Sequence, residues 1–261
     1  MRFRALTTYS PCAAFNGRAT AKERIAMDDF MLAQSPTADR PLLGVTALVV
    51  EDSLFACEAL RLLCHRSGAR LRRADSIAHA RRHLGIYRPC VILVDVGLPD
   101  GSGLELIAML AAASPRIQVI LGISGDANAE TAVMTAGADG FIAKPIANLA
   151  AFQESILRHL PANRQPPGPR IVSDEMVNPD LVAYRDDLHH ISQILNRPQG
   201  HTRIGYVTQL LDGIARSAHD DALGKAAKTL ASLHLTGSDT TPCMTALSDL
   251  VEKRIAAGGP L

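Results

Sequence analysis

Tryptophan is absent from this 261-residue sequence, which contains only six Phe and four Tyr residues. Because 47% of the residues are nonetheless hydrophobic, Ala and Leu must do most of the packing, which favours helices over β-sandwiches. An excess of charge of one sign is also missing. The formal net charge of +1 supplies no overall attraction to nucleic acid or to an anionic membrane.

Cysteines are few, and their spacing does not pair them. Cys12, Cys57, Cys64, Cys90 and Cys243 are odd in number and include no Cys-x-x-Cys pair. This argues against a disulfide framework or a zinc site and predicts reduced, mostly buried thiols. No apolar run is long enough to cross a bilayer, and the N-terminal region lacks the apolar segment of a secretory signal. We therefore expect a cytoplasmic protein.

The first 43 residues differ in composition from the rest of the chain. Arginines are scattered there among small polar residues, without a clear hydrophobic period. We expect residues 1–43 to be a disordered extension, because such a segment buries little apolar surface. Two alternatives stay open: a short helix over residues 19–32, and translation that starts at Met27 or Met31.

From residue 45 on, short apolar runs alternate with amphipathic segments. The apolar runs predict strands at 46–50, 69–74, 91–95, 117–123 and 140–143. The amphipathic segments predict helices at 53–66, 77–84, 103–113, 128–136 and 148–160. Five β-α units of this length predict an α/β domain over residues 44–160 with a doubly wound parallel sheet.

Residues 161–172 contain four prolines and a glycine, which predicts a semi-rigid linker. Beyond the linker, apolar residues recur at steps of three and four, as they do in the seams between packed helices. The first two seams are Val177, Leu181, Tyr184, Leu188, Ile191 and Leu195, and then Ile204, Val207, Leu211, Ile214 and Ala218. The last two are Leu223, Ala226, Leu230 and Leu233, and then Met244, Leu247 and Val251. Residues 173–261 are therefore expected to form an all-α four-helix bundle.

Polar side chains follow several of the predicted strands. Glu51 and Asp52 come after the first strand, Asp95 ends the third, Ser124 follows the fourth and Lys144 follows the fifth. Because the carboxyl ends of parallel strands meet at one edge of a sheet, these side chains should lie together. Three close carboxylates call for a cation, and hard oxygen ligands in a half-open cluster suit Mg²⁺. Together these groups could transfer a phosphoryl group to Asp95.

Three segments, LVVEDS (48–53), VILVDVGLPDGSG (91–103) and GFIAKP (140–145), occur in this order on these strands. Together they resemble the receiver domain of two-component response regulators, over roughly residues 45–160. The resemblance implies a flavodoxin-like fold. It also implies a phosphoryl donor, either a sensor histidine kinase or a histidine phosphotransfer protein.

The resemblance assigns a phosphorylation and metal site. Asp95 matches the phosphoacceptor and a Mg²⁺ ligand. Asp52 matches the direct metal ligand of the acidic pair, and Glu51 its water-mediated partner. The backbone carbonyl of Gly97 matches the third protein ligand. From the residues alone, Asp95 could instead cap a helix or form a salt bridge.

The resemblance also assigns the residues that respond to the phosphoryl group. Lys144 matches the phosphate-binding lysine, and Pro145 after it implies a cis peptide bond. Ser124 matches the hydroxyl that closes on the phosphoryl group, next to the small Gly125. Phe141 matches the rotameric aromatic switch. Two alternatives stay open: Phe141 as a plain core residue and Lys144 as a solvated lysine.

The function of residues 173–261 is less defined. Eleven acidic and eight basic residues give this region the wrong sign for a DNA-binding module, and no basic recognition helix follows a short turn. It weakly resembles a degenerate histidine-phosphotransfer bundle, with Lys228 where the histidine belongs. His189, His190 and His219 lack the expected flanking residues and could be plain surface histidines. We therefore expect a dimerisation or partner-docking domain and no separate enzyme activity.

The sequence leaves two other hypotheses open. The first is a phospho-regulated transcription factor with a divergent helical DNA-binding domain. The second is an aspartyl-phosphate phosphatase. Such enzymes need a second Asp two residues after the nucleophile, where this sequence has Gly97.

Overall fold

The computed structural model describes residues 35–168, 173–196 and 203–260. The region from residue 35 onward forms one compact unit. Residues 1–34, which include the predicted short helix and the alternative starts, lie outside the described residues. Within the described chain, Leu42 is already fully buried, and its N–H donates to the carbonyl of Ser67 at 2.9 Å. The α/β core therefore uses residues from the end of the segment expected to be disordered.

The centre of the α/β domain is a five-stranded parallel sheet. Its order is β2 (Arg70–Ala74), β1 (Thr46–Val50), β3 (Val91–Asp95), β6 (Val119–Ser124) and β7 (Gly140–Ala143). This is the 2-1-3-4-5 order of flavodoxin-like folds. The predicted doubly wound sheet is confirmed.

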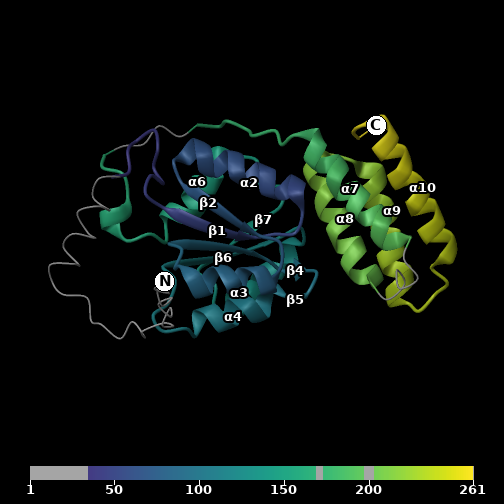
Figure 1. Cartoon of the computed structure of the whole chain (residues 1–261), viewed down its shortest axis with the longest axis horizontal. Helices are drawn as coiled ribbons and strands as arrows, with labels where there is room; N and C mark the ends of the chain where they lie inside the picture. Colours follow the sequence, from purple (N-terminus) through teal and green to yellow (C-terminus); the bar gives the residue numbers. More distant parts are fainter. Residues whose placement is uncertain (1–34, 169–172, 197–202, 261) are drawn as a thin grey trace, which may run out of the picture. The chain divides into compact units, whose positions relative to one another are not determined.

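Helices cover both faces of this sheet. Figure 1 shows α2 and α6 on one face, and α3 and α4 on the other. Their bounds, with that of α5, are Leu54–Ser67 (α2), Ile77–Ile86 (α3), Gly103–Ala111 (α4), Glu130–Thr135 (α5) and Leu149–Leu157 (α6). The expected helix over 128–136 is shorter in the structure, because a 3₁₀ turn over Ala127–Ala129 precedes α5.

The central strands are buried on both faces, which explains their continuous apolar runs. All five residues of β3 are buried. Alternate β3 residues point to two separate clusters: Leu93 packs with α2 and α6, whereas Ile92 and Val94 pack with α3 and α4. A short antiparallel pair, β4 (Gly97–Leu98) and β5 (Gly101–Ser102), follows β3 directly.

The helical domain contains four helices among the described residues. They are α7 (Leu181–Leu195), α8 (Ile204–Ala218), α9 (Asp221–Leu235) and α10 (Thr241–Ala257). The predicted seams largely form its core: residues such as Leu188, Leu211 and Leu230 are fully buried in one cluster. Among the described helices of the whole chain, none is both long and apolar enough to cross a membrane.

Two residues of the first predicted seam lie outside the bundle core. Leu181 is 48% exposed. Val177 lies in the α/β core instead of the bundle core. Its N–H donates to the carbonyl of Ala147 at 2.9 Å, and Met176 pairs with Asn148 in an isolated antiparallel bridge. After the linker the chain thus returns to the α/β domain before α7 begins.

A buried ion pair joins the helices of the bundle. Arg254 on α10 donates to both carboxylate oxygens of Asp220, at 2.6 and 3.1 Å. Asp220 also accepts from the hydroxyl of Tyr184 at 3.0 Å and caps α9 through the N–H of Leu223. Asp220, the acid next to His219 in the sequence, therefore binds residues of α7, α9 and α10.

Candidate phosphorylation site

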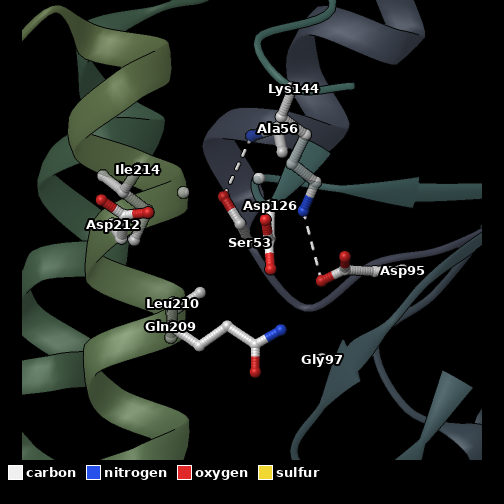
Figure 2. A pocket seen from close by; sticks show the side chains of 12 residues that line it. Ser53, Ala56, Asp95, Gly97, Asp126, Lys144, Gln209, Leu210, Asp212 and Ile214 are labelled. Carbon is white, nitrogen blue, oxygen red and sulfur yellow. Dashed lines mark hydrogen bonds and ion pairs between the residues drawn. The ribbon is translucent and has the colours of Figure 1, made fainter. Parts of the chain in front are cut away.

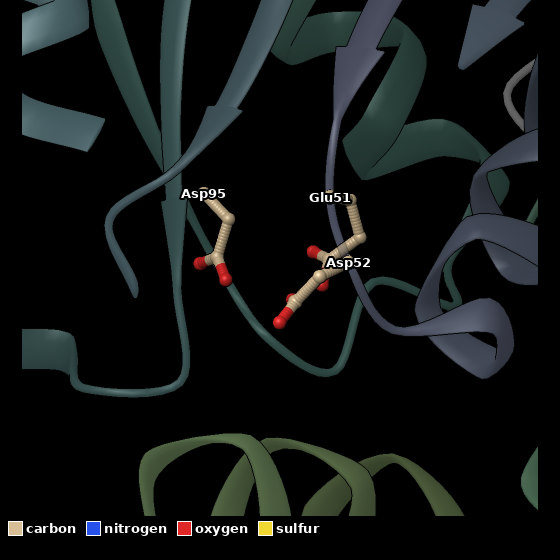
Figure 3. Close-up of side chains that lie close together, drawn as sticks. All are labelled: Glu51, Asp52 and Asp95. Carbon is tan, nitrogen blue, oxygen red and sulfur yellow. The ribbon is translucent and has the colours of Figure 1, made fainter. Parts of the chain in front are cut away.

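Three carboxylates meet where β1 and β3 end. Glu51 and Asp52 follow β1, and Asp95 is the last residue of β3. Each of the three offers a carboxylate oxygen, and these oxygens lie within 4.8 Å of one another. Figure 3 shows Asp95 on one side and the acidic pair on the other, with their carboxylates turned toward each other. The predicted cluster is therefore formed by the fold.

Lys144 supplies the positive charge at this edge of the sheet. It follows β7, and its ammonium nitrogen lies 2.6 Å from Oε2 of Glu51 and 3.2 Å from Oδ2 of Asp95. Only 7% of its side-chain surface is exposed, so the solvated-lysine alternative is wrong. The peptide bond between Lys144 and Pro145 is cis, as expected.

The pKa values of all four groups are raised, by burial for the carboxylic acids and by neighbouring charge for Lys144. Desolvation raises the pKa of Glu51 to about 7 and that of Asp95 to about 7, although Lys144 opposes both shifts. Burial also raises the pKa of Asp52, against the hydrogen bond from Tyr206. Burial alone would lower the pKa of Lys144, but Asp95 and Glu51 outweigh it and raise that pKa. Full ionisation of the three carboxylic acids is therefore unfavourable unless a further cation is bound.

The residues present fit a hard divalent cation. Three carboxylates face a single ammonium group, and carboxylate oxygens are the ligands that Mg²⁺ uses. Oδ1 of Asp52 is buried and has no hydrogen-bond partner among the described residues. A buried acceptor of this kind is costly unless a donor or a metal satisfies it.

The remaining predicted residues lie around this cluster. Ser124 ends β6 and is 2% exposed; its hydroxyl accepts from the N–H of Asp126 at 3.1 Å. The N–H of Gly97 donates to Asp95. Phe141 on β7 is half-buried against the core beneath α3 and α4. Their assigned roles, including the Gly97 carbonyl as a metal ligand, stay predictions.

Comparison with known proteins identifies the α/β domain. The family model of the response regulator receiver domain matches residues 47–156. This segment is a response regulator receiver domain. The match includes every predicted site residue from Glu51 to Lys144.

Two curated relatives are transcriptional regulators. The chain is 31% identical over 121 residues to the KDP operon transcriptional regulatory protein KdpE of Escherichia coli, covering 46% of this chain and 54% of KdpE. It is 28% identical over 114 residues to the virulence transcriptional regulatory protein PhoP of Salmonella typhimurium, covering 42% and 51%. The chain thus spans about half the length of the curated relatives it matches.

A solved structure is also similar to the receiver domain. The signal receiver domain of a signal transduction histidine kinase from Syntrophus aciditrophicus is 27% identical. The similarity covers 39% of this chain and 79% of that one, with a TM-score of 0.36.

The helical domain contributes residues that sequence reasoning missed. A cavity of about 280 Å³ is lined by Asp95, Gly97 and Lys144 of the receiver and by Gln209 and Asp212 of α8. Figure 2 shows the Gln209 side chain extending from α8 toward Gly97 and Asp95. In the sequence these residues are only polar positions beside an apolar seam. A helix face that contacts water has the same pattern, so the sequence does not reveal the contact.

Proposed function

We propose that this chain is a cytoplasmic response regulator that accepts a phosphoryl group on Asp95 from a sensor histidine kinase or a histidine phosphotransfer protein. One observation carries the proposal: Asp95 lies in the acidic cluster with the Lys144 ammonium 3.2 Å from its carboxylate. Three carboxylates and an ammonium group at one edge of the sheet supply the groups that such a transfer needs, which supports the proposal.

In the proposed transfer, the phosphoryl group moves from the donor's histidine to Asp95. An oxygen of Asp95 attacks the phosphorus, the bond from phosphorus to the donor's histidine nitrogen breaks, and the electron pair returns to the imidazole. Asp52, Asp95, Glu51 (through a water) and the Gly97 carbonyl would hold Mg²⁺, whose positive charge would offset the negative charge on the phosphoryl oxygens. Lys144 would bind one of those oxygens and give up its contact with the Asp95 carboxylate.

The signal then passes to the helical domain. New charge on Asp95 attracts the hydroxyl of Ser124 and the ammonium group of Lys144. Movement of the loop after β6 would let Phe141 turn inward, which shifts receiver states that already exist. In this proposal residues 44–160 are the receiver, 161–172 the linker and 173–261 the output domain, whose protein contacts change, as a homodimer or with a partner protein.

Phosphorylation of the purified chain tests this function. With Mg²⁺ and acetyl phosphate, intact-mass spectrometry should show one added phosphoryl group on the wild type and none on Asp95→Asn. Asp126→Asn is the matched control, because Asp126 lines the same cavity but is exposed, and it should be labelled. Labelling of Asp95→Asn equal to wild type would refute the assignment.

The alternative is a phospho-regulated transcription factor. It is supported by the relatives, whose names describe transcriptional regulators. The acidic balance of residues 173–261 opposes it, because DNA binding relies on Lys and Arg contacts with phosphates. Salt-dependent binding of the phosphorylated full-length chain to duplex DNA, absent before phosphorylation, would favour this alternative.

The phosphatase hypothesis finds no support at position 97. A Cβ atom at Gly97 would lie 2.1 Å from Nε2 of Gln209. An aspartate at this position would therefore require the Gln209 side chain to move.

A further inference from the structure

Helices α7 and α8 lie against the loops that carry the phosphorylation site. Contacts reach the loop after β1, the loop after β3 and the loop after β6, at Ser53, Gly97 and Gly125. Any donor of a phosphoryl group must approach Asp95 from this edge, because the strand itself is buried on both faces.

A buried acid on α7 anchors this contact. Asp187 is 4% exposed, and its carboxylate accepts from the Ser53 hydroxyl at 2.7 Å and from the N–H groups of Leu54 and Phe55 at 2.8 and 3.0 Å. Phe55 is 3% exposed and packs edge-on against Tyr184 in the bundle core. The anchor thus joins charge-assisted hydrogen bonds at the start of α2 with burial of an aromatic ring.

One side of α8 faces the site itself. Tyr206, Gln209, Gly213 and Arg216 are spaced by three, four and three residues, which places them on one helix face. The Tyr206 hydroxyl donates to Oδ2 of Asp52 at 2.6 Å. The amide of Gln209 lies against Gly97, and Arg216 donates to the carbonyl of Gly125.

Helix α8 also divides the space that a hydrated cation would need. The cavity with Asp95 and Lys144 contains Gln209 in its lining. A second cavity, of about 410 Å³, is lined by Asp52, Tyr206, Asp187 and Arg203. With α8 in place, Asp52 and Asp95, the two acids predicted to bind the metal directly, line different cavities. Mg²⁺ usually keeps several of its waters and needs room for them on one side of its protein ligands.

We propose that Tyr206 and the divalent cation compete for Asp52, so that docking of α8 lowers the receiver's affinity for the cation. This inference rests on the proposed function, because it concerns the same metal site. Oδ1 of Asp52 has no partner among the described residues and is open to the cation, but the phenol on Oδ2 takes up part of the charge and part of the space that a hydrated cation would use. By thermodynamic reciprocity, the bound cation favours release of α8 to the same extent.

The test measures Mg²⁺ binding to the full-length chain. Calorimetry gives the dissociation constant, and competition with Mn²⁺ in electron paramagnetic resonance checks it. Tyr206→Phe removes only the hydroxyl, and the dissociation constant for Mg²⁺ should fall by about tenfold, the equivalent of one hydrogen bond to a charged group. Tyr87→Phe is the control, since Tyr87 lies at the end of α3, and should leave the constant unchanged. Equal or weaker Mg²⁺ binding by Tyr206→Phe overturns the inference.

A second variant approaches the same equilibrium without changing a predicted metal ligand. Asp187→Asn weakens the anchor on α2 and should also tighten Mg²⁺ binding, whereas Asp186→Asn on the exposed side of α7 should not. Circular dichroism on each variant verifies folding. An unchanged Mg²⁺ constant in folded Asp187→Asn would show that α8 docking and the cation are not linked.

Asp52→Asn separates failure of the inference from failure of the proposed function. If wild type binds Mg²⁺ through Asp52 and is labelled on Asp95, but Tyr206→Phe has the wild-type constant, only the competition is wrong. If Asp52→Asn binds Mg²⁺ as wild type does and no variant is labelled, the phosphorylation site itself is wrong.

Discussion

The carboxylate of Asp187 on α7 accepts a hydrogen bond from the backbone N–H of Phe55 on α2 at 3.0 Å, although 132 positions separate the two residues. The same carboxylate binds the Ser53 hydroxyl. A side chain of the helical domain therefore helps to cap the first helix of the receiver. The two domains are joined at the site of proposed chemistry as well as through the chain.

Removal of this carboxylate should destabilise the whole chain. Asp187→Ala leaves the N–H groups of Leu54 and Phe55 without their acceptor, and we expect the free energy of unfolding to fall by about 2 kcal/mol. Urea denaturation measures this change. Asp186→Ala, one position away and exposed, should stay close to wild type. Equal values for the two variants would contradict the role of the anchor.

The receiver was largely predictable because its determinants are local. The bounds of β1 and β3 agree with the apolar runs, since strands buried on both faces need continuous Val, Ile and Leu. Glu51, Asp52, Asp95 and Lys144 then meet because parallel strands end at the same edge.

The contact between domains was not predictable from local patterns. Asp187 and Tyr206 lie beside predicted seams that are only largely confirmed, and their partners are more than 130 positions away. A polar residue beside a seam has the same signature whether it faces water or another domain. Val177 is the opposite case. Its spacing fits the first seam of the bundle, yet its N–H donates to the carbonyl of Ala147 in the α/β domain.

Asp95→Asn should stabilise the metal-free protein in a pH-dependent way. The pKa of Asp95 rises from its ordinary value of 3.8 to about 7 on burial. Between these values the native state binds a proton that the unfolded state lacks, so stability falls as the pH rises through this range. Because Asn imitates the neutral carboxyl, the gain should be on the order of 2 kcal/mol at pH 8 and much smaller at pH 5.

Urea unfolding in EDTA at the two pH values measures this difference. Asp126→Asn serves as the control, since Asp126 is exposed near the same cavity. An equal gain for Asp95→Asn at both pH values would show that burial of the ionised carboxylate is not its source.

The pair of Asp220 and Arg254 should stabilise the bundle except in strong acid. Burial opposes ionisation of Asp220, but the hydrogen bonds from Arg254, Leu223 and Tyr184 outweigh it and lower its pKa below 3.8. This stabilisation is therefore present above pH 3.8 and lost as the pH falls through the lower native value. Asp220→Ala leaves a buried guanidinium unpaired and should cost about 3 kcal/mol at pH 7.

The neighbouring acid is the control for that variant. Asp221→Ala removes an exposed carboxylate and should change the free energy of unfolding far less. Guanidinium chloride denaturation at pH 7 compares the two, with ionic strength matched. A cost for Asp220→Ala no greater than for Asp221→Ala would contradict the buried pair.

The approach of Gln209 to Gly97 is open to a double-mutant cycle. A Cβ at position 97 would lie 2.1 Å from Nε2 and 2.3 Å from Cδ of Gln209. Gly97→Ala should therefore cost about 1 kcal/mol of stability when Gln209 is present, because the amide must move away. In the Gln209→Ala background that cost should largely disappear, giving a coupling energy of about 1 kcal/mol. Gln193→Ala on α7 is exposed and should be additive with Gly97→Ala. A cycle with Gln209 that is equally additive would show that α8 does not lie against this loop in solution.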